Sequence, residues 1–310
     1  MHGSRARVLV TKLRFSIRNV TMSTETSQFK KEDHAAIYLK NRPEWPPEII
    51  QRSLSFLREK NPEPFKLAVD VGCGSGQNTR PLTPYFEKII GVDVSEAQIR
   101  AAQSLKNPPN VEFRIGSAES IAVPDRSVDL ITCAESVHWF DLDAFFREMD
   151  RILKPSGCIA IYTYHKIRPW VEGDDVKNEQ LRDMIMQLCS VTLGPYNSPG
   201  ARHLFNRLAD IRIPYDETVR NESFHIQYDT TVASYLDYIR SWAIYQAYLE
   251  KNPSGPDILK EVQKRFRLSS RRCQDTHKDS SCLASWKKTT YMYRDLFVGG
   301  EQHCLKNRVF

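Results

Sequence analysis

Five short apolar runs alternate with more polar, helix-like stretches between residues 66 and 164. They occupy residues 66–71, 88–92, 111–115, 128–133 and 158–164 and are rich in Val and Ile. Short β-branched runs of this kind are typical of strands that are buried on both faces of a sheet. Strands that alternate with helical stretches indicate a parallel sheet with crossover helices. The pattern therefore predicts an α/β domain, which we place at residues 25–268.

A helical pattern follows the last of these runs. Residues 174–209 carry apolar side chains at helical spacing, namely Leu181, Ile185 and Leu188, and residues 228–248 are rich in aromatic side chains. We expect two insertions, around 174–209 and 228–266, to form a helical cap over the ligand site. Aromatic side chains at such spacing are more often core than pocket.

The last 42 residues lose this periodicity. We expect residues 269–310 to form a divergent, poorly structured tail. A strand is indicated at 218–229, and 289–298 is the one candidate for a final strand of the sheet. The cysteine and histidine spacings of the tail match no zinc module, and we expect no metal site.

The first 24 residues contain five basic side chains and no acidic one. This composition fits a mitochondrial transit peptide, and it equally fits an upstream extension with Met22 as the start that is normally used. We exclude residues 1–24 from the fold. The expected location is the cytoplasm, or the mitochondrion if the stretch is a transit peptide.

Charge and composition exclude several classes of protein. The net charge of the 310 residues is +6, but the two ends carry it, and residues 25–268 are net acidic. A nucleic-acid-binding domain concentrates basic charge on its folded part, so we expect no nucleic-acid partner. No apolar run is long enough to span a membrane. Seven cysteines without a CxxC pair indicate a reducing compartment rather than a disulfide framework.

A glycine-rich turn follows the first apolar run directly. Residues 72–76 read Gly-Cys-Gly-Ser-Gly, and 77–79 are expected to start a helix. Glycines let the backbone approach a ligand closely, and a helix N-terminus offers unpaired N–H groups to an anion. The spacing GxGxG differs from the GxGxxG of dinucleotide sites.

Acidic residues follow the next two runs. Asp93 ends the second run, where a carboxylate can accept both hydroxyls of a ribose. Residues 116–119 end the third run with polar groups that can reach an adenine edge. Because ligands of open α/β sheets bind at the carboxyl ends of the strands, these groups indicate one nucleoside site.

Taken in order, VDVGCGSG, GVDVS, GSAES, PDRSVDLITC and LKPSGCIAI resemble the motif series of the class I S-adenosylmethionine-dependent methyltransferases. The resemblance covers about residues 33–266. It implies a Rossmann-like, doubly wound, mostly parallel seven-stranded sheet and S-adenosylmethionine as cofactor. It also implies a set of cofactor-binding residues: Asp70 and the backbone of Gly72, Gly74 and Gly76 at the methionine part, Asp93 at the ribose, and Ala118 and Glu119 near the adenine. We assign Glu135, which follows the fourth run, to the same site.

Two further stretches, 38–46 and 134–140, are similar to methyltransferases of type 11, which include trans-aconitate methyltransferases. The resemblance implies that the segment with Tyr38 and Arg42 closes over the cofactor and that the loop with His138 and Trp139 faces the reacting methyl. His138 suits a general base by its ordinary pKa, or it is a wall residue without proton transfer. Arg42 can clamp a carboxylate or pair with a surface acid. We expect Trp139 to shape the pocket.

These residues predict methyl transfer to a small molecule, with a carboxylate as the acceptor that requires no base. Two other interpretations stay open, an idle cofactor-binding scaffold and a methyltransferase acting on RNA or protein. The NPPY-type motif typical of some nucleic-acid and protein methyltransferases is missing after the fourth run, where residues 134–136 read Ala-Glu-Ser. The sequence does not give the oligomeric state.

Overall fold

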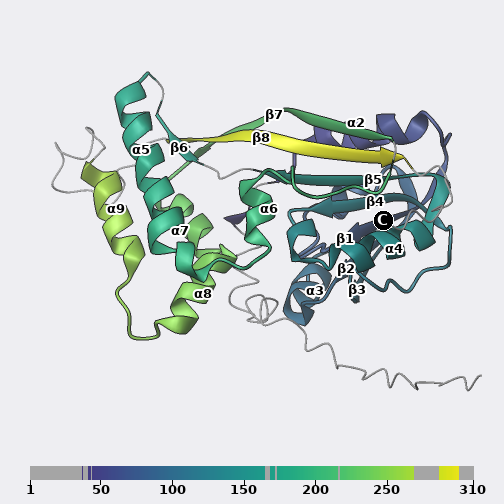
Figure 1. Cartoon of the computed structure of the whole chain (residues 1–310), viewed down its shortest axis with the longest axis horizontal. Coiled ribbons are helices and arrows are strands. Elements are labelled where there is room, and N and C mark those ends of the chain that lie inside the picture. The colour runs from purple at the N-terminus through teal and green to yellow at the C-terminus, as the bar shows by residue number, and fades with distance from the viewer. Residues whose placement is uncertain are drawn as a thin grey trace, which may run out of the picture.

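Five parallel strands form the centre of the sheet. The computed structural model describes residues 37, 41–42, 44–164, 168–171, 173–215, 217–268 and 286–299. The strands match the five apolar runs and lie in the order β3-β2-β1-β4-β5. Their bounds are β1 (Phe65–Val71), β2 (Phe86–Asp93), β3 (Val111–Ile115), β4 (Val128–Ala134) and β5 (Leu153–Tyr164). The predicted mostly parallel, doubly wound sheet is confirmed (Figure 1).

Three more strands extend the sheet beyond β5. The strand β8 (Trp286–Gly299) runs antiparallel to β5, and both β7 (Thr218–Thr230) and the short β6 (Arg168–Trp170) pair with β8. The described sheet thus has eight strands, the expected seven and the additional β6.

The strand β8 lies inside the segment 269–310 and contains the candidate strand 289–298. This part of the segment therefore differs from the poorly structured tail that we expected. The predicted tail at 269–285 and 300–310 and the extension at 1–24 lie outside the described residues.

Helices cover both faces of the central sheet because side chains of a strand alternate between the faces. Ala68 of β1 belongs to the same apolar cluster as Ile50 and Leu54 of α2 (Pro47–Arg58). Its neighbour Val69 belongs to the opposite cluster, together with residues of α4 (Leu142–Ile152). A third helix, α3 (Glu96–Gln103), starts at Ser95, whose hydroxyl accepts a hydrogen bond from Gln98 N.

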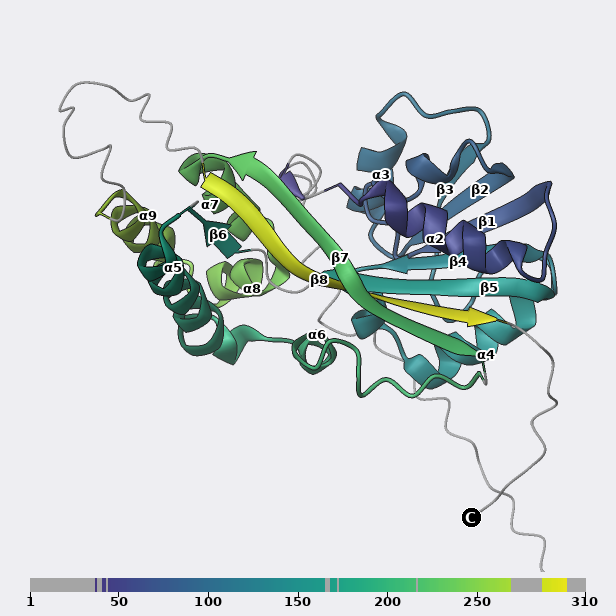
Figure 2. The same cartoon turned by 90° about the horizontal axis from the view of Figure 1, so that it is seen from above.

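A group of helices lies at the end of the sheet away from α4 (Figure 2). It consists of α5 (Asp175–Gln187), α7 (Val232–Arg240), α8 (Ala243–Lys251) and α9 (Ile258–Leu268). The short α6 (Ala201–Phe205) lies between this group and the sheet (Figures 1 and 2). Leu181 and Ile185 are buried on α5, as their spacing predicts. Within the described residues, none of the helices has the length and apolar character needed to cross a bilayer.

Candidate active site

The turn after β1 has a backbone that requires glycine. Gly72, Gly74 and Gly76 have φ values of 68°, 53° and 81°, in the left-handed region that side chains disfavour. A Cβ atom on Gly72 would lie 2.4 Å from Ser136 Cβ. The helix that we expected to start at 77–79 is replaced by turns that lead into a short 3-10 helix, Arg80–Leu82. Gly72 and Gly76 therefore let the turn pack closely against Ser136 and Phe113.

Asp70, the acid before this turn, is used inside the protein. Its carboxylate is fully buried and accepts hydrogen bonds from Asn78 Nδ2 (2.8 Å), Thr79 Oγ1 (2.6 Å) and Thr132 Oγ1 (2.7 Å). Burial raises its pKa, and the three hydrogen bonds oppose this effect. Asp70 thus fastens the turn to the sheet, and its place at the methionine part of the cofactor stays a prediction.

Asp93 lies beside the turn at the end of β2. Its carboxylate accepts hydrogen bonds from the backbone N–H groups of Gly74 and Ser95, each at 2.8 Å, and it is partly exposed. Burial raises its pKa, while the two backbone hydrogen bonds lower it. The structure therefore holds this carboxylate in a fixed orientation beside the glycine turn.

Ala118 and Glu119 follow the end of β3. Ala118 is buried, and Glu119 accepts hydrogen bonds from Asp141 N (3.0 Å) and from the Ser117 hydroxyl. The carboxyl ends of β2 and β3 are neighbours, since Asp93 pairs with Ile115. The expected ribose and adenine positions are therefore adjacent along one sheet edge.

Two cavities meet near the end of β4. The smaller, polar cleft lies against Gly72, Cys73 and the segment after the turn. The larger cavity, about 170 Å³, lies between the loop after β4 and the helices α6, α7 and α8. Arg42, Glu135 and Tyr164 line both of them.

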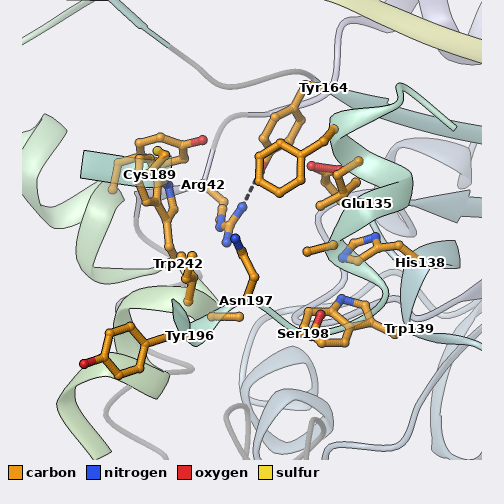
Figure 3. A pocket seen from close by; sticks show the side chains of 16 residues that line it. Arg42, Glu135, His138, Trp139, Tyr164, Cys189, Tyr196, Asn197, Ser198 and Trp242 are labelled. Carbon is orange, nitrogen blue, oxygen red and sulfur yellow. Dashed lines mark hydrogen bonds between the residues drawn. The ribbon is translucent and has the colours of Figure 1, made fainter. Parts of the chain in front are cut away.

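Arg42 occupies the middle of this junction (Figure 3). Its guanidinium donates one hydrogen bond to the Tyr164 hydroxyl (2.5 Å) and another to the Ser241 carbonyl (3.0 Å). It also lies 5.7 Å from the centre of the Tyr238 ring. These contacts come from β5 and from α7 with the residue that follows it, so the arginine joins the sheet to the cap.

Glu135 has a strained backbone, with φ at 57° in a residue that is not glycine. Its N–H donates to the Tyr162 carbonyl (2.9 Å), and its carboxylate accepts a hydrogen bond from the Thr163 hydroxyl. Burial raises the pKa of Glu135 to about 7, although the Thr163 hydrogen bond and the charge of Arg42 oppose this shift. A strained residue that is held by its surroundings often marks a functional position.

His138 and Trp139 form one wall of the larger cavity (Figure 3). His138 is 7 % exposed, and its Nδ1 atom has no hydrogen-bond partner among the described residues. Burial, together with the charges of Arg42 and His203, lowers the pKa of His138 to about 3. The imidazole is therefore neutral near pH 7 and is a weak base, which agrees with the wall interpretation.

The opposite wall contains residues that the sequence analysis did not single out. They come from the cap and its connections, and the main ones are Tyr196, Phe205, Tyr238 and Trp242. The aromatic richness of 228–248 was the available signal, and we interpreted it chiefly as core. Tyr38, expected in the lid, lies outside the described residues.

Comparisons with known proteins agree with this arrangement. Residues 69–161 match a family model described as a methyltransferase domain, Methyltransf_11. A protein of Dictyostelium discoideum that is described as a methyltransferase is 31% identical over 198 residues, covering 64% of this chain and 71% of its own. A Saccharomyces cerevisiae protein described as an S-adenosylmethionine-dependent methyltransferase, CRG1, is 27% identical over 265 residues, covering 76% and 87%.

The fold comparison gives the same family. A solved structure from Anaeromyxobacter dehalogenans, described as a type II methyltransferase, superposes with a TM-score of 0.62 at 27% identity. The match covers 84% of this chain and 99% of that chain. The chain therefore belongs to the class I S-adenosylmethionine-dependent methyltransferases with a type 11 domain, and S-adenosylmethionine is its methyl donor.

Proposed function

We propose that the chain transfers a methyl group from S-adenosylmethionine to the carboxylate of a small molecule in the larger cavity. The observation that carries this proposal is the position of Arg42, whose guanidinium lies at the junction of the two cavities. A guanidinium is the side chain best suited to bind and orient a carboxylate, because it donates two parallel hydrogen bonds.

The smaller cleft suits the methionine part of the cofactor, because the backbone of Gly72 and Cys73 lines it. Along the neighbouring strand ends, Asp93 offers acceptors for two ribose hydroxyls, and Ala118 and Glu119 follow β3. Glu135 lines both cavities, and its carboxylate can bind the ammonium group of the methionine part. When bound, S-adenosylmethionine supplies an electrophilic methyl carbon on a sulfonium and leaves as the neutral thioether S-adenosylhomocysteine.

The residues of the larger cavity have a limited task in this reaction. A carboxylate is already a nucleophile, so its oxygen forms the new C–O bond without losing a proton, and the C–S electron pair returns to sulfur. Arg42 orients the acceptor oxygen, and the aromatic walls exclude water. A neutral His138 agrees with this chemistry, because no base is required.

A curated relative supports a carboxylate acceptor. A Bacteroides thetaiotaomicron protein named malonyl-[acyl-carrier protein] O-methyltransferase is 30% identical over 122 residues, covering 38% of this chain and 46% of its own. A malonyl thioester has one free carboxylate that an O-methyltransferase can esterify. This relative thus makes the same class of acceptor reasonable for the present chain.

A second candidate is transfer to an alcohol or amine, which would require a base. The observation in its favour is Glu135, whose pKa of about 7 suits proton transfer near neutral pH. Its product would be stable to mild alkali, whereas a methyl ester is hydrolysed.

Arg42→Gln tests the proposal, with Arg42→Lys as the conservative variant and Arg182→Gln, an exposed arginine on α5, as the control. Loss of a charge-assisted contact should lower kcat/KM for a small acid by roughly 30- to 100-fold, mainly through KM. The affinity for S-adenosylhomocysteine, measured by calorimetry, should change much less. Arg42→Lys should retain only part of the wild-type kcat/KM, because an ammonium group cannot donate two parallel hydrogen bonds as a planar guanidinium does. Unchanged kinetics in a folded Arg42→Gln variant would contradict the proposal.

A further inference from the structure

The larger cavity has walls of two different kinds. The large aromatic and aliphatic side chains that line it from the cap side are Tyr196, Leu204, Phe205, Tyr238, Trp242 and Ile244. The neutral polar groups that line it include His138 from the loop after β4 and Asn197 and Ser198 from the connection before α6, with Asn197 beside Arg42 (Figure 3). An acceptor in this cavity therefore has its charged end near Arg42 and its remainder against apolar side chains.

The lining of the cavity offers a carboxylate a single cationic partner. Among the described residues that line it, Arg42 is the only lysine or arginine, and Glu135 is the only acid. A second carboxylate that enters the cavity would lose its hydration and find no cationic partner, which is strongly unfavourable for a buried charge. It would also be repelled by Glu135 whenever that carboxyl is ionised.

Resting on the proposed function, we infer that the acceptor is a monocarboxylic acid with an apolar body, and that Phe205 helps to select it by the size of that body. Phe205 lies at the end of α6, lines the cavity and is 42% exposed, so its side chain can be shortened without opening a buried core. The neutral imidazole, amide and hydroxyl that line the cavity can hydrogen-bond to an uncharged polar substituent and do not compensate a second charge. A polyacid such as the tricarboxylate trans-aconitate does not fit this distribution.

The first experiment compares acids directly. The purified full chain is incubated with S-adenosylmethionine labelled in its methyl group and with octanoate or trans-aconitate at equal concentrations. The expected result is an alkali-labile ester of octanoate, with kcat/KM at least tenfold above that for trans-aconitate. A preference for the tricarboxylate would overturn the inference and leave the proposed carboxylate chemistry in place.

The second experiment uses Phe205→Ala and, as a matched control, Leu249→Ala, which is similarly exposed on α8 and does not line the cavity. Phe205→Ala should lower kcat/KM for octanoate by about tenfold and leave that for propionate within twofold, because only the longer chain reaches the lost ring. An equal change for both acids, or none, would overturn the role of Phe205. Failure to esterify any acid, in a chain that binds S-adenosylhomocysteine, would overturn the proposed function itself and the inference with it.

Discussion

The conformation of the glycine turn leads to a quantitative prediction for Gly72→Ala. Gly72 has a φ of 68°, and an added Cβ would lie 2.4 Å from Ser136 Cβ and 2.9 Å from Ser136 Oγ. Ser136 Oγ also donates a 2.8 Å hydrogen bond to the Val71 carbonyl. Gly72→Ala therefore destabilises the fold in two ways, through the unfavourable positive φ of an alanine and through the steric clash of its Cβ with Ser136.

Gly173→Ala separates these two contributions. Gly173 has a nearly identical φ of 72°, and a Cβ there would meet nothing within 4 Å. A left-handed alanine costs about 1–2 kcal/mol, and the smaller entropy of its unfolded chain offsets about 0.4–1 kcal/mol of this. Gly173→Ala should therefore lower the free energy of unfolding by about 1 kcal/mol. Gly72→Ala should lower it by about 3 kcal/mol, because overpacking and the disturbed Ser136 hydrogen bond are added.

Urea unfolding of the two variants and the wild type measures both effects, provided that the m-values agree. Calorimetry with S-adenosylhomocysteine measures the effect on cofactor affinity. This affinity should differ between the two variants, because Gly72 lines the smaller cleft and Gly173 does not. Gly72→Ala should weaken binding by tenfold or more, whereas Gly173→Ala should leave it unchanged. If the two substitutions lowered the free energy of unfolding equally and left equal cofactor affinities, the close contact between residue 72 and Ser136 would be refuted.

Three further predictions concern the titratable groups of the site. Asp93→Ala should weaken S-adenosylhomocysteine binding by at least tenfold in calorimetry, and wild-type affinity would remove Asp93 from the ribose site. Burial raises the pKa of Glu135 from 4.5 to about 7, so the folded chain holds a proton that the unfolded chain has released in this window. Relative to Glu135→Gln, the wild type should lose roughly 2–3 kcal/mol of unfolding free energy from pH 4.5 to 8, and parallel pH dependences would contradict this. His138→Gln should lower kcat by less than tenfold, because the neutral imidazole is a weak base. A wild-type kcat profile with a limb near pH 6.5 that disappears in His138→Gln would show proton transfer instead.

The parallel half of the sheet and the glycine turn could be predicted because their signals are local. A buried strand has to be apolar and β-branched, and a turn at positive φ has to contain glycine, as at Gly72 and Gly76. The same locality explains why Asp93 could be placed at the end of the second strand, where its role at the ribose stays a prediction. The hydrogen-bond partners of Asp70 could not be predicted, because Asn78, Thr79 and Thr132 become its neighbours only after folding. Its place at the methionine part of the cofactor stays a prediction.

The larger cavity depended on contacts that are distant in the sequence. Arg42 bonds to Tyr164 and Ser241, which are 122 and 199 residues away, and no periodicity encodes such a pairing. The aromatic side chains of 228–248 were expected chiefly in the core, and Tyr235 is indeed buried there, while Tyr238 and Trp242 also line the cavity. The pKa of His138 likewise depends on its burial and on nearby charges, neither of which the sequence displays.

The alkali stability of the product tests the central claim, a carboxylate acceptor, most directly. The wild-type chain is given methyl-labelled S-adenosylmethionine and a mixture of small acids, alcohols and amines, and the labelled product is treated with mild alkali. A carboxylate acceptor predicts that the label is released as volatile methanol. A label that stays on an alkali-stable product would contradict the claim and would show methylation of an alcohol, amine or thiol.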